Sequence, residues 1–117
     1  MLLTEAVEDW VGRRLPEPYR SFLETAAVEM PVGDRVLLYG RDVFVERNET
    51  FETKAYCVGY VTVGDDGGGK QFLLSLETGA VSVVDAGAMT PDAARDVAGD
   101  FGAWYAAGCP LPDDLWD

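Results

Sequence analysis

The segment Gly64-Asp65-Asp66-Gly67-Gly68-Gly69-Lys70 separates two apolar runs and decides the fold of this chain. The preceding run is Val58-Gly59-Tyr60-Val61-Thr62-Val63, and the following run is Gln71-Phe72-Leu73-Leu74-Ser75-Leu76. Both are rich in β-branched, aromatic or aliphatic residues, which favour the half-buried surface of a sheet. Glycine tolerates positive φ, so the segment predicts a tight loop between two strands.

Further strands are predicted on both sides of this pair. A tight turn at Glu77-Thr78-Gly79 leads to a strand at Ala80–Val84, and a short buried strand is expected at Arg35–Tyr39. The three successive strands after residue 57 have short connections, which predicts an antiparallel meander.

Helices are predicted before and after these strands, from apolar residues at three- and four-residue spacing. Asp42 is a candidate N-cap for one of them, although Val43–Val45 alone also suits a strand, and Thr90 is a candidate N-cap for the last. The predicted helices cover residues 3–15, 19 to about 31, 42–53 and 90–108. We therefore expect one α+β domain, with an antiparallel β-sheet meander and with N-terminal and C-terminal helices packed on one face.

The composition indicates a single domain of 117 residues with a net charge of -12, from 21 acidic and 9 basic side chains. Nucleic acids and anionic membranes are disfavoured as partners because they attract cationic surfaces. A basic protein partner is favoured, although the charge also serves solubility. No apolar run is long enough for a membrane span, and the N-terminus lacks the features of a secretion signal. With two distant cysteines expected as reduced thiols, a cytoplasmic location is predicted.

Catalytic, metal and nucleotide sites find little support in the sequence. Lys70 is followed by Gln71 and a strand, unlike a phosphate-binding loop, and Asp65 and Asp66 would repel a phosphate. The aspartate pair suits a hard cation but lacks regularly spaced further ligands. The chain has no histidine, and Cys57 lies in an apolar run typical of a core thiol. No catalytic residue, metal or cofactor is expected, and a metal-dependent enzyme centred on the aspartates is a minor alternative.

The tryptophans divide by their surroundings. Trp10 and Trp104 fall on apolar helix faces and are expected in the core. Trp116 lies in an acidic tail, where it either docks on the domain or contacts a partner.

Two blocks of the sequence resemble the SUKH superfamily, which includes the domain of the fungal cell-wall assembly regulators called Smi and Knr. Glu46-Arg47-Asn48-Glu49-Thr50-Phe51-Glu52 followed by residues 59–69 is similar to the family signature. Leu15-Pro16-Glu17-Pro18-Tyr19-Arg20-Ser21-Phe22-Leu23 resembles the family's entry to a helix, and a C-terminal helix with Phe101 and Trp104 fits its ending. The chain departs from the family at residues 26–31, where an asparagine-glycine turn is common. The resemblance implies a single SUKH-like domain over residues 1–117.

Bacterial members of this superfamily are associated with immunity against polymorphic toxins, many of them nucleases. The resemblance therefore implies a non-catalytic protein that binds and blocks a toxin, which would carry a basic cleft. A regulatory interaction module without a toxin partner remains the alternative. The candidate partner-contact residues are Asp65, Asp66, Glu46, Glu49 and Trp116. Gly64, Gly67, Gly68 and Gly69 are expected to shape the loop, in which an aspartate caps backbone amides.

Overall fold

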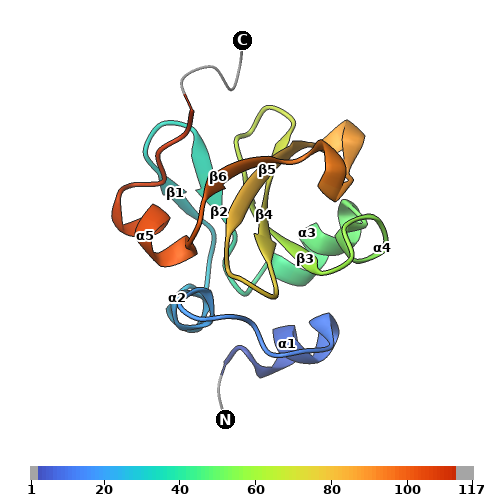
Figure 1. Ribbon diagram of the computed structural model, residues 1–117. Helices are drawn as coiled ribbons and strands as arrows, with labels where there is room; N and C mark the ends of the chain where they lie inside the picture. The colour runs from blue at the N-terminus through green and yellow to red at the C-terminus, as the bar shows by residue number, and fades with distance from the viewer. Residues whose placement is uncertain (1–2, 113–117) are drawn as a thin grey trace.

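A six-stranded antiparallel sheet forms the centre of the computed structural model, which describes residues 3–112 (Figure 1). Helices α1 and α2 precede the sheet, α3 and α4 are inserted between its second and third strands, and α5 follows it. The elements are α1 (Glu5–Val11), α2 (Tyr19–Thr25), β1 (Met30–Val32), β2 (Val36–Leu38), α3 (Phe44–Thr50), α4 (Thr53–Tyr56), β3 (Tyr60–Asp65), β4 (Lys70–Ser75), β5 (Val81–Asp85), the 3₁₀ turns η1 (Ala86–Ala88) and η2 (Pro91–Ala93), β6 (Arg95–Ala98) and α5 (Phe101–Ala106).

The strands follow one another in chain order, from β1 to β6, so the sheet is a meander. The predicted pairing around the glycine-rich loop is confirmed, with Asp65 opposite Gln71 and Tyr60 opposite Ser75. The register shifts between Thr62 and Gly64, where β3 carries a bulge. The predicted α+β class is thus correct, and the meander has more strands than expected.

The N-terminal and C-terminal helices pack on the same face of the sheet, as predicted. Phe72 and Leu74 point into the main core on this face, because alternate residues of a strand share a face. Trp104 of α5 contacts Phe72, with ring centroids 5.5 Å apart. Phe101 meets Tyr19 of α2 edge-to-face at 4.9 Å. Burial of each such side chain contributes about 1.5–3 kcal/mol to the stability of the fold. Because the cluster contains residues of both α2 and α5, it holds the two ends of the chain together.

A smaller core lies on the opposite face of the sheet. Leu73 and Val84 point to that side and pack with Cys57 and Met89. Phe51 adds to the cluster from the turn after α3. In Figure 1, α3 and α4 lie to the right of the sheet, away from α2 and α5 on the left. Phe51 and Cys57, which flank α4, therefore help to cover this second face, whereas Phe44 at the start of α3 packs in the main core beside Tyr19.

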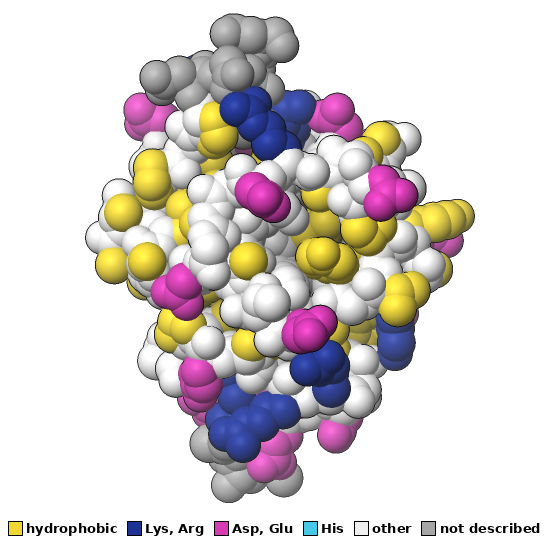
Figure 2. Space-filling view, viewed as in Figure 1, with side chains coloured by type: hydrophobic (Ala, Val, Ile, Leu, Met, Phe, Trp, Pro, Cys, Tyr) yellow, Lys and Arg dark blue, Asp and Glu magenta, His cyan; other side chains and the backbone are white. Residues whose placement is uncertain are grey.

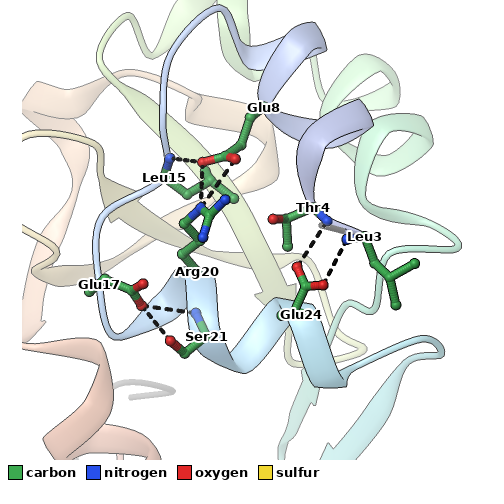
Figure 3. Close-up of polar contacts among 8 residues, drawn as sticks. All are labelled: Leu3, Thr4, Glu8, Leu15, Glu17, Arg20, Ser21 and Glu24. Atoms are coloured by element: carbon green, nitrogen blue, oxygen red, sulfur yellow. Dashed lines mark hydrogen bonds and ion pairs between the residues drawn. The ribbon is translucent and has the colours of Figure 1, made fainter. Parts of the chain in front are cut away.

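Helix α1 is held to α2 by the carboxylate of Glu8. Its Oε2 atom accepts a hydrogen bond from the Leu15 amide at 2.7 Å and lies 3.0 Å from Nε of Arg20 (Figure 3). Both charged side chains are only 12% exposed. The pair therefore fixes the connection between the two helices.

Two more carboxylates satisfy backbone groups in the same region. Glu24 accepts hydrogen bonds from the amides of Leu3 and Thr4, at 2.7 and 3.1 Å (Figure 3). Chiefly the Leu3 amide holds the pKa of Glu24 below its ordinary value. Glu17 accepts from the hydroxyl and the amide of Ser21, and the hydroxyl is the main cause of its lowered pKa. These acids support the helix pair.

The prediction of one helix over residues 90–108 is wrong in its first half. Residues 95–98 form strand β6, which pairs with β5, and only Phe101–Ala106 is helical. Thr90 does act as a cap, but for the short turn η2. The cap of α5 is Asp100, which accepts a hydrogen bond from the Ala103 amide at 2.8 Å. Aspartate is a preferred N-cap residue, but the apolar spacing predicted a helix that continued through this position.

Other boundaries also differ from the predictions. Helix α1 ends at Val11 rather than at residue 15, because its C-cap Gly12 has a left-handed φ of 91°. Helix α2 ends at Thr25, and Met30–Val32 is an edge strand, a position where Pro31 is tolerated because no partner needs its missing amide hydrogen. A helix does occupy most of residues 42–53, but Val43 rather than Asp42 occupies its N-cap position.

Within the described residues, no helix has the length and apolar character needed to cross a membrane. Both cysteines are buried free thiols. Burial raises the pKa of Cys57 and raises that of Cys109 to about 11, so both stay protonated near neutral pH.

Candidate functional site

The two loop aspartates direct their carboxylates at the loop's own backbone. Oδ1 of Asp65 accepts a hydrogen bond from the Gly67 amide at 2.9 Å. Oδ1 of Asp66 accepts from the amides of Gly68 and Lys70, at 2.8 and 3.0 Å. These bonds orient the turn and offset the repulsion between the two neighbouring charges.

The four loop glycines differ in what would prevent another residue from replacing them. A Cβ on Gly64 would lie 2.4 Å from the backbone oxygen of Leu37, because β2 approaches β3 closely there. Gly67 and Gly69 have φ of 75° and 105°, which other residues rarely adopt. Gly68 has neither restriction, since a Cβ would lie 3.6 Å from the Asp66 carboxylate.

Tyr39 connects this loop to helix α3. Its hydroxyl donates to Oδ2 of Asp65 at 2.6 Å and contacts the side-chain oxygen of Gln71 at 3.2 Å. Burial, followed by the bond to Asp65, raises the pKa of Tyr39. The guanidinium of Arg47, on α3, lies 6.0 Å from the centroid of the Tyr39 ring. The loop and the helix are therefore supported by one buried side chain.

Tyr39 and Tyr19 provide a matched pair of buried hydroxyls. The Tyr19 hydroxyl has no hydrogen-bond partner within residues 3–112, whereas that of Tyr39 is bonded. We expect Tyr39→Phe to lower the free energy of unfolding by about 1–3 kcal/mol, because it leaves the Asp65 carboxylate with one bond fewer. We expect Tyr19→Phe to leave stability unchanged or raise it by up to about 1 kcal/mol, because it removes an unsatisfied buried group. Urea unfolding measures both, and equal losses would contradict the assignment.

Asn48 is a structural residue that sequence reasoning passed over. It is fully buried and holds α3 against β3. Its Nδ2 donates to the backbone oxygens of Phe44 and Thr62, both at 2.9 Å, and its Oδ1 accepts from the Thr62 amide at 2.7 Å. The signal was present, because an amide side chain on the apolar face of a helix needs a buried partner.

Four exposed carboxylates follow the length of α3, which we call the α3 carboxylates. Glu46 and Glu49 lie on the helix, Asp42 precedes it and Glu52 follows it. Within residues 3–112, none of the four side chains forms a hydrogen bond or an ion pair. The three-residue spacing of Glu46 and Glu49 places these two on one side of the helix. Two of the predicted contact residues therefore belong to an unpaired anionic surface.

In most other regions the acidic side chains either have hydrogen-bond or ion-pair partners or lie far from one another. Asp85 pairs with Lys70 at 2.6 Å, and Asp100, Glu8, Glu17 and Glu24 accept the bonds described above. On the face drawn in Figure 2, acidic side chains are scattered, some between apolar and neutral atoms and some beside basic groups. Basic groups lie toward the two ends of that view. This face therefore shows no broad acidic patch.

An apolar groove of ≈ 430 Å³ lies between α1, α4 and the start of β3. At one side Lys54 donates to the Trp10 backbone oxygen at 2.7 Å and lies 4.9 Å from the centroid of its ring. Trp10 is half-buried here rather than in the core, whereas Trp104 is buried as predicted. Apolar contacts in the groove come from Trp10, Val11, Val58, Tyr60, Val61 and Leu76.

The remaining predicted contact residue, Trp116, lies outside the described residues. The structure brings Asp65 and Asp66 together in the loop and Glu46 and Glu49 together on α3. Within the described chain, no hydrogen bond or ion pair joins the loop aspartates to Glu46 or Glu49. The loop and α3 are connected through Tyr39, whose hydroxyl bonds to Asp65 and whose ring lies under the guanidinium of Arg47. In that same part of the chain, no three His, Cys, Asp or Glu residues form a group able to hold a metal ion.

These features define a small α+β domain whose buried polar side chains largely support the backbone. The chain belongs to the SMI1 / KNR4 family (SUKH-1), whose family model matches residues 3–107. The resemblance found in the sequence is thereby confirmed. No curated protein matches the chain in sequence.

Proposed function

We propose that this protein is a non-catalytic immunity protein that binds a cognate toxin and covers its active surface. The toxin is a protein with a basic cleft, such as a nuclease domain. The observation that carries the proposal is the unpaired row of α3 carboxylates on a domain of the SUKH-1 family.

The loop aspartates and the α3 carboxylates differ in whether their oxygens are already used in hydrogen bonds. Asp65 and Asp66 already accept backbone hydrogen bonds, so using them for a partner would weaken the loop. Glu46 and Glu49 have no such role within residues 3–112 and extend into solvent. A net charge of -12 steers a basic partner toward the molecule, and exposed carboxylates then pair with its cations. If the partner is a nuclease, the carboxylates take the place of substrate phosphates.

The proposal is tested with any toxin-like protein that is encoded next to this chain. Co-expression is expected to rescue growth, and the purified pair is expected to bind. We expect Glu46→Lys combined with Glu49→Lys to weaken binding by about 10- to 1,000-fold and to abolish rescue, because like charges then face each other. Binding of the natural pair is expected to weaken as salt is raised, since exposed charges are screened.

The matched control is Asp92→Lys combined with Asp96→Lys. Both positions are exposed and far along the chain from α3, and the change alters net charge equally. This control is expected to retain rescue. The proposal fails if neither binding nor rescue occurs with the neighbouring protein, or if both double variants lose binding equally.

A further inference from the structure

The groove between α1, α4 and β3 differs in charge from the rest of the molecule. Its lining residues include the cations Arg13 and Lys54 and no carboxylate. The whole chain carries 21 acidic and only 9 basic side chains, so this local balance is reversed. The groove is therefore suited to a different ligand from the one that the α3 carboxylates attract.

Arg13 is the cation at this site that remains open to a ligand. Lys54 already binds the Trp10 carbonyl. Arg13 is exposed and makes no hydrogen bond or ion pair within residues 3–112. Arg13 also lines the neighbouring hollow, together with Glu5, Glu8 and Asp9, but none of these three carboxylates lines the groove. An arginine with open donors matches a carboxylate in a paired geometry.

Two further donors line the groove without partners in the described part of the chain. These are the indole N–H of Trp10 and the hydroxyl of Tyr60, both on half-buried side chains. Such groups usually have a hydrogen-bond acceptor when they are covered. A ligand that supplies oxygen acceptors as well as apolar surface would satisfy them.

Apolar surface is also open at the rim. Val58 is 77% exposed, next to Gly59, where a Cβ would meet nothing within 4 Å. The volume of ≈ 430 Å³ lies within the ~300–1,000 Å³ typical of ligand sites. There is thus room for a bulky side chain of a partner beside its backbone.

We propose that this groove binds an acidic and apolar segment of a protein partner. A bulky apolar side chain of the segment packs against Trp10 and Val58, and an adjacent carboxylate pairs with Arg13. The site is separate from the α3 carboxylates, and it requires neither a toxin nor a basic partner. The protein would then have two different binding surfaces, one for a basic partner and one for an acidic segment.

The test uses ¹H–¹⁵N NMR of the full chain with two synthetic peptides, acetyl-Asp-Leu-Phe-Asp-Leu-amide and its counterpart with lysine in place of each aspartate. The acidic peptide is expected to shift the Trp10 indole and Gly59 amide signals saturably. The lysine peptide is expected to bind at least about fivefold more weakly, since a single exposed charge contact is worth up to ~1 kcal/mol.

Arg13→Glu is expected to weaken binding of the acidic peptide by about fivefold or more. The matched control is Arg14→Glu, because Arg14 is also exposed but does not line the groove. It is expected to change binding by less than about twofold. The inference is overturned if neither peptide shifts the groove signals, if the lysine peptide binds as well, or if the two variants lose affinity equally. Loss of toxin rescue plays no part in these readouts, so this inference and the proposed function fail separately.

Discussion

Gly64→Ala is expected to destabilise the domain by about 3 kcal/mol or more, to the point of poor folding. The added methyl group would lie 2.4 Å from the Leu37 backbone oxygen and 3.3 Å from the Leu38 Cα. Neither atom belongs to a side chain that can rotate away. Relief would require β2 to separate from β3, next to the bulge that already disturbs the register. Urea unfolding, with the yield of soluble protein, measures the effect.

Gly68→Ala is the matched control in the same loop. Its φ lies outside the left-handed region, and the new Cβ would make ordinary contact with the Asp66 carboxylate. Because alanine restricts the unfolded chain more than glycine does, stability is expected to stay equal or to rise by up to about 1 kcal/mol. Equal losses for the two variants would contradict the view that the loop glycines have different roles.

Asn48→Ala is expected to lower the free energy of unfolding by roughly 3–4 kcal/mol. The change removes three hydrogen bonds and leaves the buried Thr62 amide without its acceptor. Asn48 and Thr62 are both fully buried, so the Thr62 amide left without its acceptor carries a desolvation penalty. The helix that carries Glu46 and Glu49 would lose its main polar attachment to the sheet. Denaturant unfolding gives the free energy, and amide hydrogen exchange of α3 locates it.

Thr50→Ala tests whether the effect belongs to the buried amide rather than to the helix. Thr50 is exposed on the same helix, and its replacement is expected to change stability by less than about 0.5 kcal/mol. A loss below about 1 kcal/mol for Asn48→Ala would show that α3 is held mainly by its apolar contacts.

The sequence was informative where local pattern and tertiary packing agree. The hairpin around residues 64–70 was predictable because glycine loops and β-branched runs act over short distances. Residues 90–108 were not, because Ala94 and Val97 also fit a helix that continues into Phe101. The outcome depends on β5, whose unpaired edge accepts residues 95–98 as a sixth strand. Pairing of this kind is not encoded in local spacing.

The candidate surfaces were predictable to a different degree. Exposure of Glu46 and Glu49 follows from helical periodicity, and the capping role of the loop aspartates was one of the two readings expected. The groove was not predictable, because Trp10, Lys54 and Val58 come from separate segments that only the fold brings together. Trp10 fits an apolar helix face in the sequence, and nothing local distinguishes a groove wall from the core.

The two outer strands of the sheet bear on how copies of this chain behave when crowded together. β1 has only three residues, and Pro31 cannot donate a hydrogen bond to an incoming strand. β6 has four residues and presents the charged side chains of Arg95 and Asp96 to solvent. Both borders thus discourage edge-to-edge stacking, so the open meander resists fibrillar association at high expression.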